Sequence, residues 1–211
     1  MINKEIVEWC TGIINKLCEE NRFRNKEIQQ GVDGEKEHAI TVLSWVKKLE
    51  KHPSVALRIS ALFHDIDRLV TPGAGRGFAG DRKSEEYLLH KKMHAKRSAD
   101  YTSQKLKEMG IEESIIIKTR FLIEHHDDIL EEISSYKDKD LEILVAADAF
   151  SWFSTTGINL LKSEGEERTK DKLRFILSKT PKFALELLPE VKINNLVLEN
   201  LKKHVLKEII K

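Results

Sequence analysis

Apolar residues return every three or four positions along almost the whole chain, and this spacing constrains the fold more than any other feature of the sequence. Ile2, Ile6 and Trp9 begin one such series, and Val42 and Trp45 belong to another. This spacing places the residues on one face of an α-helix, whereas a half-buried strand would need strict alternation. No such alternation extends over any length, so we expect an all-α protein.

The prolines and most of the glycines fall between these periodic segments and mark the expected helix ends. We expect helices at about residues 2–17, 38–49, 53–69, 85–109 and 114–133, a further one that Asp138 caps, and two or three between 166 and 211 that break at Pro181 and Pro189. Pro53 should lie in the first turn of the third helix, and Ser84 and Gly110 should delimit the fourth. The length of 211 residues favours one domain, residues 1–165, with a C-terminal helical extension, residues 166–211.

The composition argues against several classes of function. Lys and Arg number 36 and Asp and Glu 35, so the net charge of +1 gives no whole-chain preference for nucleic acid or anionic membranes. Glu5 and Glu8 interrupt the start of the chain, and no apolar run is long enough to cross a bilayer, so we expect a cytoplasmic protein without a membrane partner. Cys10 and Cys18 are expected as buried thiols in a reducing compartment.

Two aspartates are expected in apolar surroundings, which is unfavourable for a charged group. Asp65 follows His64 at the apolar end of the third helix, and Asp148 lies in the sixth, which is apolar on nearly every side. Such a charge must be paired or coordinated, and no Lys or Arg lies one helical turn from Asp148. A metal cation bound by both carboxylates and by neutral imidazoles would resolve both problems. A second His-Asp pair, at 126–127, lies among further acids and is expected in more solvated surroundings.

In this order, His38, the pair His64-Asp65 and the distant Asp148 resemble the motif of the HD-domain superfamily of metal-dependent phosphohydrolases, over about residues 30 to 165. The resemblance implies an HD-type helical bundle. The dinuclear branch of that superfamily adds further histidines, for which this chain offers His94 and the doublet at 125–126. The chain lacks the Gly-Tyr-Pro triplet that some cyclic-dinucleotide enzymes carry after the doublet, which argues against a cyclic-dinucleotide substrate.

The resemblance also implies a ligand set, with Asp65 bridging two metal ions. The first ion would be held by His38, His64, Asp65 and Asp148, and the second by Asp65, His94, His125 and His126. His90, one turn before His94, is the alternative ligand on that helix. Imidazole and carboxylate donors suit one or two divalent transition metals, namely iron, manganese, zinc or nickel. If only the first ion binds, the site resembles the mononuclear nucleotidase branch, and the remaining histidines contact substrate or support the ligands.

The activity implied is hydrolysis of a phosphate ester or phosphoanhydride, in a nucleotide or a related small molecule, by a metal-activated hydroxide. We expect Asp65, Asp67 and Arg68 to be the catalytic side chains. Asp67 would either donate a proton to the leaving group or orient a ligand imidazole. The residues expected to bind substrate phosphate are Arg68, Arg76, Arg82, Lys83 and Arg97.

Three of these cations lie in the glycine-rich segment 71–83, which is either a mobile lid or a plain connector. Its G-x-G-x-x-G spacing does not indicate dinucleotide binding, because a helix rather than a strand precedes it. Two other functions stay open, namely a non-catalytic metal- or nucleotide-binding regulatory module and an HD-type di-iron oxygenase. The apolar face of the last helix could serve a homo-oligomer as easily as the core; its members are Leu196, Leu201, Val205 and Ile209.

Overall fold

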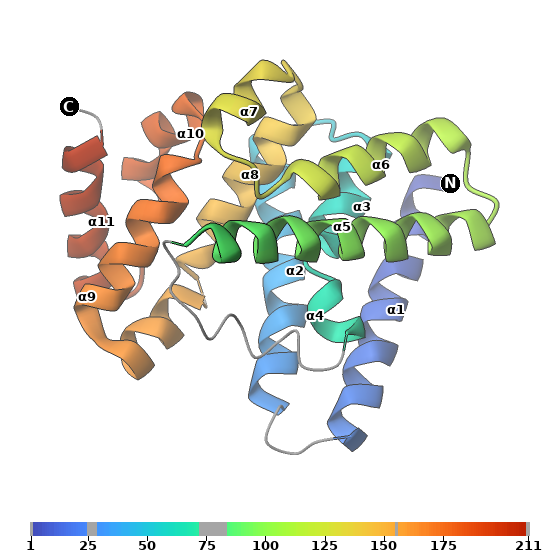
Figure 1. Ribbon diagram of the computed structural model, residues 1–211, viewed down its shortest axis with the longest axis horizontal. Coiled ribbons are helices and arrows are strands. Elements are labelled where there is room, and N and C mark those ends of the chain that lie inside the picture. The colour runs from blue at the N-terminus through green and yellow to red at the C-terminus, as the bar shows by residue number, and fades with distance from the viewer. Residues whose placement is uncertain (1, 25–28, 72–83, 155, 210–211) are drawn as a thin grey trace.

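The computed structural model describes residues 2–24, 29–71, 84–154 and 156–209, and the side chains of 2–4, 22–24 and 29–33 are not described. Within these ranges the chain is a bundle of helices without a strand, as expected (Figure 1). The helices are α1 (Ile2–Arg24), α2 (Gln29–Leu49), α3 (Val55–Phe63), α4 (Asp67–Val70), α5 (Glu85–Glu108), α6 (Glu113–His125), α7 (Leu130–Ser135), α8 (Lys139–Trp152), α9 (Thr156–Ser178), α10 (Lys182–Leu187), the 3-10 helix η3 (Leu188–Glu190) and α11 (Leu196–Ile209). None of these helices is long and apolar enough to cross a bilayer.

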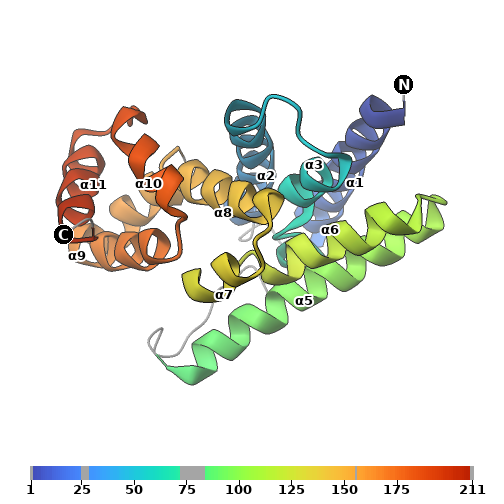
Figure 2. The same cartoon turned by 90° about the horizontal axis from the view of Figure 1, so that it is seen from above.

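The longest helices frame a buried centre. Helices α5 and α6 lie side by side along one flank, and α1 lies at the opposite end of the molecule from α9, α10 and α11 (Figures 1 and 2). Helix α3 is short and almost wholly buried, with α1, α2, α6 and α8 packed around it. This central position carries the His64-Asp65 pair at the end of α3 into the interior.

The helix ends follow ordinary capping rules. The side chains of Ser54, Ser84 and Asp138 accept hydrogen bonds from backbone N–H groups in the first turns of α3, α5 and α8, at 3.0 to 3.2 Å. Gly110 follows α5 with a φ of 70°, which a glycine adopts without steric cost. The expected roles of Ser84, Asp138 and Gly110 are confirmed, whereas Pro53 precedes the cap of α3 rather than lying in its first turn.

Two expected helices are each interrupted. The helix expected to run to about residue 69 ends at Phe63, and after a tight turn α4 begins at Asp67. The N–H of Asp67 donates to the Ser98 hydroxyl on α5 at 3.1 Å, so a tertiary hydrogen bond replaces a helical one. The helix expected over residues 114–133 likewise ends at His125 and restarts as α7 at Leu130.

The C-terminal helices pack against the rest of the molecule through α8. Helix α9 crosses the expected boundary at residue 165, and its axis kinks at Gly165, where φ is 80°. A second core cluster joins one face of α8 to these helices, with Phe150, Leu173 and Leu177 among its buried members. Helix α8 is therefore shared between the two core clusters, and it carries Asp148 between them.

Candidate metal centre

Helices α2 and α3 bring two imidazoles and a carboxylate together in the interior. The Nε2 atoms of His38 and His64 are 3.1 Å apart, and they lie 3.8 and 3.9 Å from Oδ2 of Asp65. One ligand atom from each of these three residues falls within 4.8 Å of the others. Ligands that share one transition-metal ion at about 2.1 Å lie roughly 3 to 4 Å apart, so the group fits a metal ion.

Asp148 on α8 completes the set expected for the first ion. Its Oδ1 lies 3.3 Å from Nε2 of His38 and 3.8 Å from Nε2 of His64. Burial alone would raise the pKa of Asp148, but the hydrogen bond with His38 and the charge of Lys179 hold it well below the ordinary value. Asp148 is thus an ionised carboxylate that faces two imidazoles.

The second oxygen of Asp65 faces another pair of imidazoles. Its Oδ1 lies 2.7 Å from Nε2 of His94 on α5 and 3.6 Å from Nε2 of His126, which follows α6. The Asp65 carboxylate therefore lies between two pairs of imidazoles. A carboxylate that bridges two metal ions must occupy such a position. The structure places His94, rather than its neighbour His90, against Asp65.

These four histidines all use their second ring nitrogen in the same way. The Nδ1 atoms of His64 and His126 face the backbone carbonyls of Ala61 and Ile123, at 3.3 and 2.7 Å. A carbonyl can only accept, so each Nδ1 carries the proton and each Nε2 keeps its lone pair. The Nδ1 atoms of His38 and His94 face Ser151 Oγ and Asp67 Oδ2, both at 3.0 Å. Metal-ligating histidines are held in this manner.

The charges at the site favour a bound cation. Burial lowers the pKa of His64 to about 4 despite the nearby charges of Asp65 and Asp148, so His64 is a neutral imidazole. Burial would raise the pKa of Asp65, yet Arg68 and the surrounding histidines hold it well below its ordinary range. Nε2 of His64 presents its lone pair to Nε2 of His38 at 3.1 Å, a position that suits either a proton on His38 or a metal ion shared by the two rings.

His125, expected as a ligand of the second ion, is directed elsewhere, which corrects that expectation. Its Nδ1 lies 2.6 Å from Oδ2 of Asp128, and its ring packs against Phe121 and Tyr136. Adjacent residues at a helix end point about 100° apart, so only His126 of the doublet faces Asp65. Among the described residues, no ion pair or hydrogen bond joins His125 to the other expected ligands.

Asp67 lies behind His94 rather than in the pocket. Its carboxylate accepts hydrogen bonds from His94, from Thr71, and from two nitrogens of Arg97 at 2.8 Å. Burial would raise the pKa of Asp67, but these hydrogen bonds hold it far below its ordinary value. Of the two expected roles, this geometry favours orientation of His94 over proton donation. Arg97, expected to bind substrate, is engaged by Asp67 instead.

Arg68 is placed beside the centre, as expected. Its guanidinium lies 2.9 Å from Oδ2 of Asp65 and 3.1 Å from Glu35 on α2. Arg76, Arg82 and Lys83, the three cations of the expected lid, lie outside the described residues.

An open pocket of about 480 Å³ adjoins the centre, and four of the expected ligands line it. Its lining also contains cationic, acidic and apolar side chains that were not among the expected site residues, namely Lys91, Lys172, Lys179, Asp127, Ala149, Trp152, Thr156 and Ile176. Lys179 lies 3.9 Å from Asp148, so the residue directly after α9 supplies the cation that no residue one helical turn from Asp148 provides. Asp127 is buried, with a side chain only 4% exposed, which corrects the solvated setting expected for the 126–127 pair.

A weak signal for these cations exists in the sequence. Lys91 lies three residues before His94 and therefore on the same face of α5. Lys172 and Lys179 lie seven residues apart, which is two helical turns, so the spacing places Lys179, directly after α9, on the same side as Lys172. Nothing local to α9 indicates that this face meets the metal centre, because the contact depends on tertiary packing.

A family model described as Domain of unknown function (DUF4202) matches residues 14–199. All the residues of the centre and its pocket lie within this range. A search of curated proteins gave no match, and a search of solved structures gave none either.

Proposed function

The chain belongs to the DUF4202 family, whose description names no function, and from the site itself we propose that the protein is a metal-dependent phosphohydrolase. It would cleave a phosphate ester or phosphoanhydride of a nucleotide or a related small molecule. The observation that carries the proposal is the union of two features, an imidazole and carboxylate cluster around Asp65 and a pocket beside it lined by four cationic side chains.

The donor set fits iron, manganese, zinc or nickel. His38, His64, Asp65 and Asp148 would hold one ion, and Asp65 with His94 and His126 a second. When bound, such ions supply a Lewis acid and lower the pKa of a water molecule.

The chain's own residues account for the rest of the site. Arg68 and the pocket lysines provide N–H donors to phosphoryl oxygens and offset their negative charge. Asp67 keeps the ring of His94 in one orientation through its hydrogen bond to Nδ1. Trp152, Ala149 and Ile176 give part of the lining an apolar character that suits the organic portion of a substrate.

The reaction balances without a further reactant. A water oxygen forms a bond to phosphorus as the bond from phosphorus to the leaving oxygen breaks. The leaving oxygen keeps the electron pair of that bond and takes one proton, so one water is consumed for each bond cleaved. The cationic lining favours this reaction over oxygenation, because an oxygenase substrate need not be anionic.

The first test is the metal content of the purified chain, prepared without added metal or a chelating tag. Under the proposal the wild type carries two ions, Asp65→Ala carries nearly none and His126→Ala carries about one. His125→Ala is the matched control, since its ring faces away from Asp65, and it should keep the wild-type content. Loss of metal in the control but not in His126→Ala would contradict the ligand assignment.

The second test is turnover with a panel of phosphomonoesters, phosphodiesters and phosphoanhydrides, with dissolved oxygen monitored in parallel. Phosphate release without oxygen consumption supports the proposal. Oxygen consumption would favour a di-iron oxygenase. A fully metallated chain that turns over none of these compounds would favour the regulatory module and overturn the proposed activity.

A further inference from the structure

Two lysines pair with one buried carboxylate beside the metal centre, and a third lysine lines the same pocket. Lys91 of α5 forms an ion pair with Oδ2 of Asp127, and Nζ of Lys179 lies 2.5 Å from Oδ1 of the same residue. Lys172 of α9, seven residues before Lys179, lines the same pocket. The side chains of Lys91 and Lys179 are only 14% and 7% exposed. Lysine is rarely buried to this extent unless its charge is balanced.

The charges in this part of the pocket do not balance once the metal centre is filled. The lining contains three carboxylates, of Asp65, Asp127 and Asp148, and four cationic side chains. Bound metal would take up the charges of Asp65 and Asp148. Asp127 then remains to balance the two ammonium groups that pair with it, of Lys91 and Lys179, while Lys172 lies in the same pocket. Uncompensated charge in a partly buried pocket is unfavourable, so an anion bound there would be stabilised.

The state of Lys172 supports the same conclusion. Burial, together with the charges of Lys91 and Lys179, lowers its pKa to about 7, although Asp127 opposes the shift. The side chains that line the pocket therefore disfavour a third ammonium charge. An anionic ligand would supply the missing partner.

The lysines lie directly beside the metal ligands. Nζ of Lys179 is 3.9 Å from Oδ2 of Asp148, and Oδ2 of Asp127 is 3.4 Å from Nε2 of His126. A group held by the lysines is thus a near neighbour of a phosphoryl group at the centre. The two phosphoryl groups of a phosphoanhydride, which share one bridging oxygen, are neighbours in the same way.

Building on the proposed function, we propose that Lys91, Lys172 and Lys179 bind a second phosphoryl group of the substrate. The substrate is then a phosphoanhydride, a diphosphate or longer, rather than a simple phosphomonoester. Hydrolysis adds water across the bridging P–O bond, and the departing phosphoryl oxygen keeps the electron pair.

The test is calorimetric binding to the full chain as purified, with two probes that cannot be hydrolysed. Methylenediphosphonate carries two phosphonyl groups, and methylphosphonate carries one. We expect the wild type to bind methylenediphosphonate at least tenfold more tightly than methylphosphonate, and this ratio of affinities is the quantity measured. Lys172→Gln and Lys91→Gln should each reduce this ratio to less than threefold, since each removes a donor to the second group.

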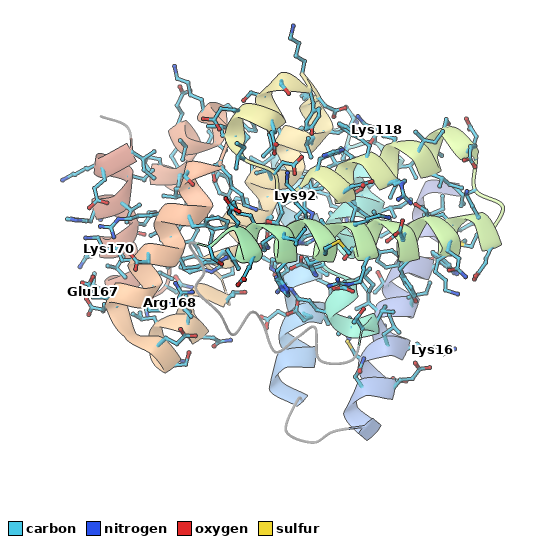
Figure 3. All side chains as sticks on the ribbon, viewed as in Figure 1. Lys16, Lys92, Lys118, Glu167, Arg168 and Lys170 are labelled. Atoms are coloured by element: carbon cyan, nitrogen blue, oxygen red, sulfur yellow. The ribbon has the colours of Figure 1, made fainter. Side chains whose placement is uncertain are left out.

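The matched controls are Lys170→Gln and Lys92→Gln, on the same two helices (both residues are labelled in Figure 3). Lys170 pairs with Glu208 and Lys92 with Glu132, and neither lines the pocket. Both variants should keep the wild-type ratio, and thermal unfolding of all four should show that they fold. A wild-type ratio near one, or an unchanged ratio in folded Lys172→Gln, would overturn the inference.

The outcome is separable from that of the proposed function. Tight diphosphonate binding that depends on the lysines, without turnover of any phosphate compound, would keep the subsite and reject the hydrolase. Turnover of monoesters with no preference for the diphosphonate would keep the hydrolase and reject the subsite.

Discussion

At the scale of single residues, the centre is defined by what each histidine does with its second ring nitrogen. His64 and His126 donate to carbonyls of their own helices, so local geometry fixes them. His94 instead depends on Asp67, which lies 27 residues away in the sequence. Asp67 is in turn held by Arg97 and Thr71. The orientation of His94 therefore rests on a chain of charge-assisted hydrogen bonds.

Asp67→Asn should weaken metal binding rather than only slow turnover. The amide loses the negative charge that raises the basicity of His94 and attracts Arg97, and changes of this kind typically cost about 10- to 100-fold in metal affinity. Metal retained after dialysis against a competing chelator measures the effect. Asp100→Asn is the control, because Asp100 pairs with Lys96 and Arg120 on the surface of the same flank. Full metal retention with lost turnover would return Asp67 to the role of proton donor.

Lys172 makes stability depend on pH in a defined window. Its pKa is lowered to about 7 in the folded chain from an ordinary value of 10.5, so between these values the unfolded chain binds more protons. The contribution of Lys172 to the free energy of unfolding therefore falls as the pH drops from 10.5 towards 7, and it stays low below pH 7. The facing groups are Lys91, Lys179, Arg68 and Asp127.

Lys172→Met should remove the stability loss that the wild type shows between pH 10.5 and pH 7. We expect the free energy of unfolding of metal-free Lys172→Met to exceed that of wild type by about 1 to 3 kcal/mol at pH 7, with a smaller difference at pH 10. Urea unfolding across the range measures it. Lys170→Met, on the same helix but paired with Glu208, should follow the shape of the wild-type curve. A difference that does not vary with pH would show that the effect is one of packing alone.

Six of the clustered side chains could be predicted because the resemblance to the HD-domain motif implied them, and the apolar settings expected for Asp65 and Asp148 pointed to a bound cation independently. His125 could not be separated from His126, since the choice depends on where α6 ends. Lys179 could not be found, because its link to Asp148 spans 31 residues and exists only after α9 has packed against α8.

At the scale of elements, the short buried helix α3 determines where the centre lies. Ser54 begins it, accepting from the N–H of Leu57 at 3.0 Å and donating to Asp140 on α8 at 2.7 Å. At the other end of α3 the chain turns, and the Ser98 hydroxyl accepts a hydrogen bond from the N–H of Asp67. Apolar spacing predicted the helix and its burial, but the turn depends on a partner from α5, which no local pattern indicates.

Ser54→Ala should destabilise the chain by about 1 to 2 kcal/mol, because it removes the N-cap hydrogen bond of α3 and the link to α8 together. Ser54→Thr keeps a hydroxyl at the cap and should recover most of the loss. Chemical denaturation of both variants measures the difference. If both variants lose the same stability, packing around the side chain rather than the hydrogen bonds would be responsible.

At the scale of the whole molecule, the centre joins parts that are distant in the sequence. Its ligands come from α2, from the end of α3, from α5, from the end of α6 and from α8, and its pocket also requires α9. Two core clusters meet along α8, one with the N-terminal helices and one with the C-terminal helices. The periodicity of the sequence predicts the helices but not this shared element, because it does not specify which faces meet.

Removal of metal should therefore lower the stability of the entire fold. A ligand that binds only the folded chain stabilises it by about 2.7 kcal/mol when its concentration is 100 times its Kd. For a chain of this length, 1 kcal/mol corresponds to about 2 to 4 °C in Tm, so a chelator should lower Tm by roughly 5 to 11 °C. Scanning calorimetry before chelation, after it and after restoring the metal measures the shift. Asp65→Ala should not respond to chelator, because the bridging carboxylate is gone, whereas His52→Ala, changed at an exposed histidine, should respond like wild type. An equal response in Asp65→Ala and His52→Ala would mean that the stabilising metal binds elsewhere and that the centre around Asp65 does not hold the fold together.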